Sequence, residues 1–231
     1  MNPERSDQRG VRSSSPVDHL DDERHLAIRF VDSVLSSRRM CRDFLADPVP
    51  PEPLEGVLGA AFGGPAAGNT HGLDLVVLSG ADVARHWDLT LPPERRDGFA
   101  WPGLLRAPVL VEVVVDPDAY VRRYGRPDKA SSGLGVGVDA WDVPFWFVDG
   151  GAAVMAMLIA AEARGLGALF FGLFDHERAL LDALGVPVGR RALGTVALGW
   201  PAPSGRSPSR SARSGRPDPR THVHRGGWSL G

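Results

Sequence analysis

The sequence predicts an α+β fold of three layers, in which a mixed central sheet of four to five strands is covered by helices on both faces. Helical patterns alternate along the chain with short apolar segments that are typical of buried strands. These segments span residues 73–78, 107–115, 168–172 and 192–199. A hydrophobic fraction of 43% in 231 residues is sufficient for one sizeable domain with tails.

The first part of the chain changes character at Glu23. Residues 1–22 are polar and charged without periodicity, which predicts a disordered leader. From Glu23 onward, apolar residues fall mostly on one stripe and predict a helix of about four turns that ends near Arg38. Residues 47–53 are rich in proline and predict a rigid extended connection. Residues 54–62 then predict a short helix.

The middle of the chain contains the strand predicted most clearly. Residues 107–115 are β-branched and apolar, which indicates a central strand. Before it, residues 81–87 predict a helix, and residues 88–106 predict a loop with a short helix. Residues 116–143 form a long segment with a Gly-x-Gly-x-Gly run. No strand precedes this run and no Lys-Ser/Thr pair follows it, so a mobile lid is favoured over a nucleotide loop.

The last third of the domain contains a long helix. Residues 145–164 are apolar almost all round, which predicts a buried helix. Asp149 on this helix is either a hidden acid or, as we favour, a local cap or ion-pair partner. Asp175 is expected to cap a helix over residues 177–184. The pattern thus predicts three parts, a leader (1–22), a folded domain (23–201) and a Ser/Arg/Pro-rich C-terminal segment (202–231).

The composition excludes several classes of protein. A net charge of -2 gives no general attraction to nucleic acid. The single Cys41 excludes an internal disulfide, and a packing role is favoured for it. The histidines lack the spacing of a metal site, and no Gly-x-Ser-x-Gly nucleophile motif is present. No signal peptide is visible, and the longest apolar run, around residues 154–163, is too short to span a membrane, so a cytoplasmic protein is expected.

Two motifs carry the chemistry. Residues 36–44 read Ser-Ser-Arg-Arg-Met-Cys-Arg-Asp-Phe, and guanidinium groups crowded at a helix end suit a phosphate. A solvated cluster that complements the helix C-terminus is the alternative. Residues 64–71 read Gly-Pro-Ala-Ala-Gly-Asn-Thr-His. Small residues of this kind let backbone amides approach a flat ligand closely.

In this order the two motifs resemble those of the nitroreductase family of FMN-dependent oxidoreductases. That family typically shows Arg-Arg-Ser-x-Arg-x-Phe after its first helix and Ala-Pro-Ser-x-x-Asn-x-Gln-Pro-Trp before its first core strand. The order, the separation and most residue types match. The departures are Met40, Ala66, His71, Gly72 and Leu73 in place of Ser, Ser, Gln, Pro and Trp. The resemblance covers residues 24–228.

The resemblance implies a set of FMN contacts. Arg38 and Met40 would hold the phosphate and ribityl end, and Arg42 would lie near the N1–C2=O edge. A backbone N–H near Gly172 would face flavin N5, and the small-residue loop would come from the other subunit. Residues 100–103 lack a lysine that some members place there, so Arg42 would carry that charge alone. The implied cofactor-binding residues are Arg38, Arg39, Met40, Arg42, Pro65, Ala66, Ala67, Asn69, Phe170, Phe171, Gly172, Leu173, Arg213 and Arg216.

The resemblance also implies a reaction. NAD(P)H would reduce FMN and leave, and an electron-poor acceptor such as a nitroaromatic or a quinone would then be reduced in the same slot. The candidate walls of that slot are Trp101, Tyr124, Trp141 and Phe145. The implied assembly is a homodimer with a domain-swapped C-terminal arm and with residues 145–164 at its interface. Three alternatives stay open, namely a family branch that uses a deazaflavin, degrades flavin or removes halide, a flavin storage or sensing protein without turnover, and an unliganded domain with a basic tail.

Overall fold

The computed structural model of the chain describes residues 16–205 and 215–228. Within the unit formed by residues 38–231, four strands make one sheet in the order β1-β2-β4-β3, and all neighbours pair antiparallel. The strands are β1 (Leu73–Ser79), β2 (Val109–Val115), β3 (Gly167–Phe171) and β4 (Arg191–Gly199). The four apolar segments predicted as strands are therefore confirmed.

The strand directions differ from the expected mixed sheet. Among the described residues, the parallel pairing is limited to an isolated bridge between Met40 and Ala168. In this bridge the Cys41 N–H donates to the Ala168 carbonyl at 2.9 Å. Composition indicates that a segment is a strand, but the strand's direction depends on which segments become its neighbours. The central position predicted for β2 is confirmed, because every residue of it is buried.

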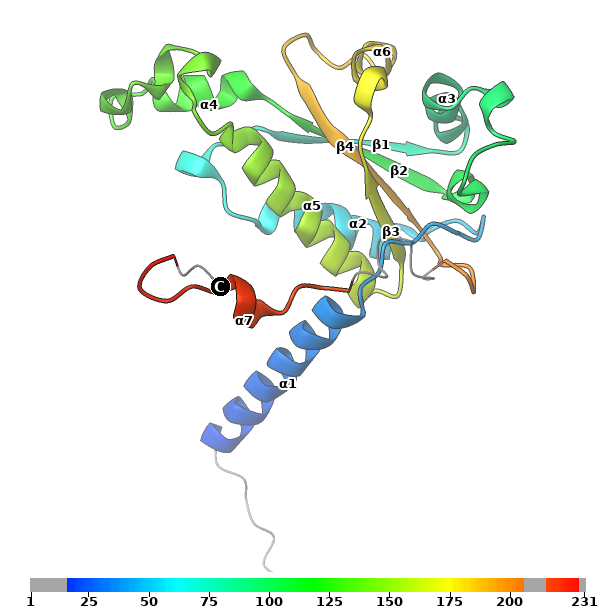
Figure 1. The fold of residues 1–231 in the computed structure, drawn as a ribbon, viewed down its shortest axis with the longest axis horizontal. Helices are drawn as coiled ribbons and strands as arrows, with labels where there is room; N and C mark the ends of the chain where they lie inside the picture. The colour runs from blue at the N-terminus through cyan, green and yellow to red at the C-terminus, as the bar shows by residue number, and fades with distance from the viewer. Residues whose placement is uncertain (1–15, 206–214, 229–231) are drawn as a thin grey trace, which may run out of the picture. The chain divides into compact units, whose positions relative to one another are not determined.

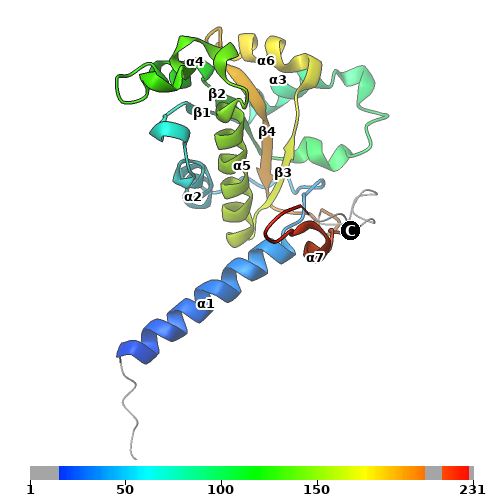
Figure 2. The same ribbon diagram turned by 60° about the vertical axis from the view of Figure 1, so that its left-hand side comes forward.

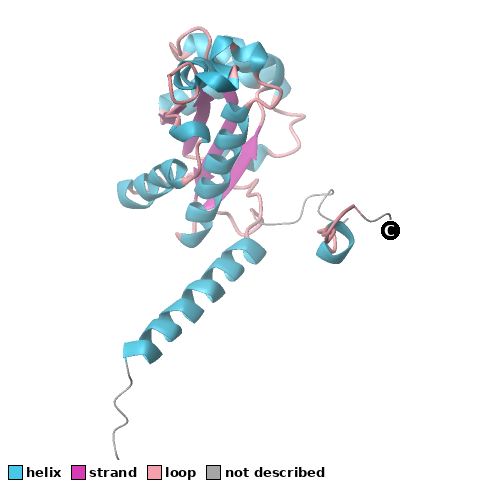
Figure 3. Ribbon diagram, turned by 90° about the vertical axis from the view of Figure 1, so that its left-hand side faces the viewer, coloured by secondary structure: helices cyan, strands magenta, loops and turns pink. Residues whose placement is uncertain are grey.

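Helices cover both faces of the sheet (Figures 1 and 2), and Figure 3 shows the strands, in magenta, between them. The helices of this unit are α2 (Pro51–Ala60), α3 (Ala81–Thr90), α4 (Pro117–Tyr124), α5 (Phe145–Ala163), α6 (Glu177–Ala183) and α7 (Pro219–His222). Val111 and Val196 pack in the cluster beneath α2 and α5. Their neighbours Leu110 and Ala197 pack with α3 in a separate cluster. Alternate strand residues thus supply two cores, which confirms the three layers.

The unit formed by residues 1–37 contains α1 (Pro16–Ser37). The helix predicted from Glu23 is present, but it begins at Pro16, inside the segment predicted to be disordered. Proline suits the first turn of a helix because its missing N–H has no helical partner there. Several large apolar side chains of α1 are exposed, among them Leu26 at 61% and Phe30 at 52%.

The segment 116–143, predicted as a long lid without structure, is instead folded. It contains α4 and three short 3-10 turns. Tyr120 and Trp141 are 2% and 7% exposed and pack with Trp146 in a third cluster. The backbones of Gly125 and Gly135 approach so closely that a Cβ on Gly135 would collide with Gly125. Close packing, rather than a phosphate loop, therefore explains this glycine.

Helix α5 is present as predicted. Among the described helices, it is the one long and apolar enough to cross a membrane by length and composition. The expectation that no segment is long enough is therefore corrected. Eight residues of α5 are buried, including Met157 and Ala161, and a core helix of this kind passes the same test. Asp175, predicted to cap α6, lies one residue before the N-cap His176, and no side chain caps this helix.

Candidate functional site

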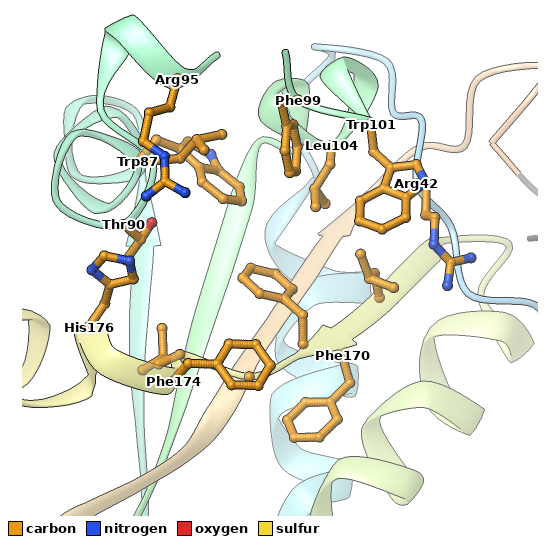
Figure 4. Close-up of a pocket in the computed structure, with 15 residues that line it drawn as sticks. Arg42, Trp87, Thr90, Arg95, Phe99, Trp101, Leu104, Phe170, Phe174 and His176 are labelled. Atoms are coloured by element: carbon orange, nitrogen blue, oxygen red, sulfur yellow. The ribbon is translucent and has the colours of Figure 1, made fainter. Parts of the chain in front are cut away.

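A pocket with a cavity volume of about 390 Å³ lies beside the end of β3 (Figure 4). It is lined by Arg42, Trp87, Thr90, Leu91, Arg95, Phe99, Trp101, Leu104, Leu169, Phe170, Phe171, Gly172, Leu173, Phe174 and His176. Aromatic and aliphatic side chains make up most of the wall, and Arg42 and Arg95 add guanidinium groups. A pocket of this composition suits a flat ligand that carries negative charge.

Arg42 is held at one end of this pocket. Its backbone N–H donates to the Gly205 carbonyl at 3.0 Å, and its guanidinium donates to the Met40 carbonyl at 3.2 Å. The guanidinium carbon lies 5.7 Å from the centre of the Trp101 ring, which is a cation–π contact. Figure 4 shows Arg42 and Trp101 at the same end of the pocket. Arg42 therefore presents a positive charge to the pocket from a fixed position.

The other residues of the arginine motif lie outside the pocket lining. Arg39 donates to the Arg38 carbonyl at 3.0 Å, and Met40 forms the bridge to β3. The Nε atom of Arg38 is buried and has no hydrogen-bond partner among the described residues. A buried N–H without an acceptor is costly, so this donor is suited to an anion. Cys41 is fully buried, which confirms the packing role favoured for it.

The residues at the end of β3 form the wall predicted to contact the cofactor. Phe171 stacks on Trp87 with ring centres 5.7 Å apart and an interplanar angle of 11°. Next to them, Phe174 has a φ of 48° and is 87% exposed. A Cβ on Gly172 would lie 3.5 Å from the Phe174 ring, so this ring covers Gly172. Left-handed backbone is strained for an aromatic residue, and such strain is typical of binding sites.

Behind this wall lies a buried polar group that the sequence analysis did not identify. His86 Nδ1 is 2.8 Å from Glu112 Oε1, and both side chains are fully buried. Thr195 donates a hydrogen bond of 2.7 Å to the other carboxylate oxygen. The separation of His86 Nδ1 and Glu112 Oε1 is that of an ion pair. Neither His86 nitrogen, however, forms a hydrogen bond with the described residues. His86 meets the Phe171 ring edge-on at 6.2 Å, so this group supports the pocket wall.

The small-residue loop is anchored from below by Asp149 of α5. The Ala67 N–H and the Tyr120 hydroxyl both donate to Asp149 Oδ2, at 2.7 and 2.8 Å. The interpretation of Asp149 as a local cap or ion-pair partner is therefore wrong, because both of its hydrogen-bond partners are neutral groups from distant parts of the chain. The pKa of Tyr120 is raised above its ordinary value, mainly by burial and secondly by the hydrogen bond to Asp149. Arg123 also donates to the Gly68 carbonyl at 2.7 Å, so the loop is held at two points.

The loop lines a second pocket rather than the first. This second pocket has a volume of about 550 Å³ and is lined by Gly68, Asn69, Thr70, His71, Ala119, Arg122, Arg123, Arg126 and Asp128. Pro65, Ala66 and Ala67 line neither pocket. The loop was predicted to contact a cofactor held by the other subunit, and this stays a prediction because the structure holds one chain.

Of the four aromatic residues predicted as walls of a substrate slot, Trp101 lines the first pocket. The other three pack against one another. Trp141 lies 4.7 Å from the Tyr124 ring centre and 6.2 Å from that of Phe145. Within this single chain they do not line the first pocket, and a role toward a second chain stays a prediction.

The two C-terminal arginines predicted to meet the phosphate differ in what the structure shows. Arg213 lies outside the described residues. Arg216 lies in the described segment 215–228 and is exposed. Which of them meets an anion stays a prediction.

Sequence reasoning missed several pocket residues, namely Trp87, Thr90, Arg95, Phe99, Phe174 and His176. Arg95 lines the same pocket as Arg42 but at its opposite end (Figure 4), so the expectation that Arg42 alone carries the charge beside the flavin stays a prediction. These residues lie on α3 and on loops without a motif, so tertiary packing alone brings them together. The signal available for Asp149 was its place as an acid within an apolar helix.

Comparisons with known proteins show the family to which the chain belongs. A model of the nitroreductase family matches residues 35–200. A protein of Archaeoglobus fulgidus provisionally named an NADH dehydrogenase/NAD(P)H nitroreductase is 23% identical over 172 residues, or 73% of this chain and 83% of that protein. Because the family model covers most of the chain, the protein belongs to the nitroreductase family.

Solved structures share the fold. Nitroreductase A of Vibrio parahaemolyticus superposes with a TM-score of 0.64 at 18% identity, covering 87% of this chain and 78% of that one. A provisionally named nitroreductase of Desulfovibrio desulfuricans, crystallised in complex with FMN, gives a TM-score of 0.61 at 24% identity, covering 84% and 96%. The fold expected from the resemblance is therefore confirmed.

Proposed function

We propose that this protein is an FMN-dependent oxidoreductase that takes hydride from NAD(P)H and reduces an electron-poor acceptor such as a nitroaromatic or a quinone. The observation that carries the proposal is the first pocket. It brings Arg42 from the arginine motif to the wall formed by residues 170–173, as the resemblance implies. Membership of the nitroreductase family and the FMN complex of the Desulfovibrio desulfuricans neighbour support the choice of cofactor.

The residues present fit FMN. The buried Nε–H of Arg38 has no acceptor among the described residues, and a phosphate oxygen would satisfy it. Arg42 presents positive charge where a flat ring with an electron-rich edge would lie beside Phe170 and Phe171. When bound, FMN would supply the hydride-transfer chemistry between donor and acceptor.

The residues of the chain itself would bind and orient the ligands and exclude water from the first pocket. Trp87 and Phe171 stack to close the floor of the pocket, and the fully buried His86 and Glu112 fix this pair from behind. A pocket with low water content strengthens the electrostatic effect of Arg42 on a ring that becomes negative on reduction. Arg42 therefore favours the reduced cofactor without transferring a proton itself.

We also propose that the working form is a cytoplasmic homodimer. Helix α5 buries one face in the core, but Phe145 and Val148 on another part of it are 39% and 49% exposed. Exposed apolar side chains on a rigid helix are typical of an interface between subunits. In this assembly Pro65, Ala66, Ala67, Asn69 and the aromatic residues Tyr124, Trp141 and Phe145 would complete the site of the partner, and residues 202–231 would form an arm on it.

The proposal is tested with Arg42→Ala. We expect this variant to bind FMN about 10- to 100-fold more weakly, the range for loss of a charge-assisted hydrogen bond. Arg178→Ala is the matched control, because Arg178 is exposed on α6 and pairs with Asp182 away from the pocket. FMN retention after dialysis and steady-state oxidation of NADPH with an added quinone are measured. Full retention of FMN in Arg42→Ala would contradict the role of Arg42. Retention of FMN without NADPH oxidation in the parent protein would favour a storage protein.

A further inference from the structure

The second pocket differs chemically from the first. Its lining carries three guanidinium groups, Arg122, Arg123 and Arg126, against one carboxylate, Asp128. Ala119 supplies the sole apolar side chain larger than glycine in that lining. Such a surface offers no slot in which an aromatic acceptor could stack. It is suited to a ligand group that is small, polar and negatively charged.

The charges of this pocket are only partly neutralised. Arg123 forms two hydrogen bonds to Asp128, at 3.0 and 2.8 Å, which cancels the one acid in the lining. Arg122 lies 2.8 Å from Asp116, but the same carboxylate also pairs with Arg190. Arg126 is exposed and forms no ion pair with the residues that the structure describes. The pocket therefore keeps a net positive charge.

The geometry distinguishes the residues that hold the loop in place from those that are available to contact a ligand. Arg123 donates to the Gly68 carbonyl at 2.7 Å and so fixes the loop. Gly68 and Asn69 both have positive φ, at 63° and 54°, and this turn forms one side of the pocket. A Cβ on Gly68 would lie 2.8 Å from the Tyr124 ring, so glycine allows the loop to approach α4 this closely. Arg126 then remains to contact an anion, together with the part of the Arg122 guanidinium that is not bonded to Asp116.

We propose that this pocket binds a phosphomonoester, namely the 2′-phosphate of NADPH, and that the protein therefore prefers NADPH to NADH. This inference rests on the proposed function, in which residues 65–69 lie beside the cofactor of the partner subunit. A reductant that reaches that cofactor would pass next to the second pocket. The 2′-phosphate is the group that distinguishes the two nucleotides, and a guanidinium with no counter-ion selects the charged form over a hydroxyl.

The test compares both nucleotides with the FMN-loaded enzyme. In Arg126→Gln we expect the KM for NADPH to rise about 10- to 100-fold, while kcat and the KM for NADH stay unchanged. Arg178→Gln is the control for loss of an exposed helix-associated guanidinium elsewhere. Adenosine 2′,5′-bisphosphate should compete with NADPH in the parent enzyme, and adenosine 5′-monophosphate should not.

Other sources of the phosphate are separated by the same experiment. If Arg126→Gln loses FMN on dialysis and keeps its nucleotide preference, the pocket serves the cofactor phosphate and the inference is overturned. An unchanged ratio of the two KM values in an active, FMN-loaded variant overturns it as well. These outcomes differ from failure of the proposed function, in which the parent protein itself would bind no flavin or oxidise neither nucleotide.

Discussion

The anchoring of the small-residue loop by Asp149 gives the most detailed prediction. One carboxylate oxygen accepts hydrogen bonds from the Ala67 N–H and the Tyr120 hydroxyl, at 2.7 and 2.8 Å. Tyr120 is 2% exposed, so water cannot replace the lost acceptor at its hydroxyl. Asp149→Ala leaves two donors without an acceptor, and we expect a loss of about 3–5 kcal/mol in the free energy of unfolding.

Asp149→Asn removes the charge of this side chain and keeps its shape, so it isolates the contribution of the charge to stability. The amide oxygen can still accept both bonds, but charge-assisted bonds are about twice as strong as neutral ones, so a loss of about 1–2 kcal/mol is expected. Tyr120→Phe removes the orphaned hydroxyl, and in combination with Asp149→Ala it should cost about 1–2 kcal/mol less than the sum of the single changes. The matched control is Asp142→Asn, since Asp142 is an exposed acid near the start of α5.

Urea unfolding followed by tryptophan fluorescence measures these free energies. FMN retention provides a second readout, because a released loop would weaken the proposed contact with the cofactor. The reasoning is refuted if Asp149→Ala unfolds within about 0.5 kcal/mol of the parent protein, the range of an ordinary surface change. It is also refuted if the double variant shows strict additivity.

Two further predictions concern pH. Burial and Asp149 raise the pKa of Tyr120 above 10.0, so the unfolded chain ionises first and stability should fall as the pH rises above 10, a loss that Tyr120→Phe removes. The hydrogen bond from Arg191 lowers the pKa of Glu177, so its contribution is present above the unfolded pKa and lost as the pH falls through the folded one. Glu177→Gln should therefore be less stable by about 1 kcal/mol at neutral pH and should become equal to the parent once the pH lies below the lowered pKa of folded Glu177, as urea titrations at each pH would show.

The strands and the core helix were predictable because their signals are local. Residues 109–115 are mostly valine, and α5 is apolar on nearly every side. Helix α4 was missed because it is short and mostly polar, and its buried Tyr120 packs on Trp141, which lies far along the chain. The pairing of strands depends on their neighbours, so the antiparallel sheet could not be read from composition.

The residues of the candidate site also fall into those that the sequence predicted and those that only the folded structure reveals. Arg42 and residues 170–173 were found because they lie in segments that resemble family motifs, and the pocket brings them together. Arg95 and Trp87 could not be found, because packing of α3 and the loop after it places them there. Asp149 was recognised as unusual, but its partner Ala67 lies in a loop that only the folded chain brings above α5.

The visible absorption spectrum of the purified protein tests the central claim most directly. We expect the bands of oxidised flavin, bleached by NADPH and restored by a quinone, with FMN released on denaturation at one molecule per chain. A colourless protein that gains no such bands when titrated with FMN would contradict the assignment of the first pocket and every functional inference that depends on it.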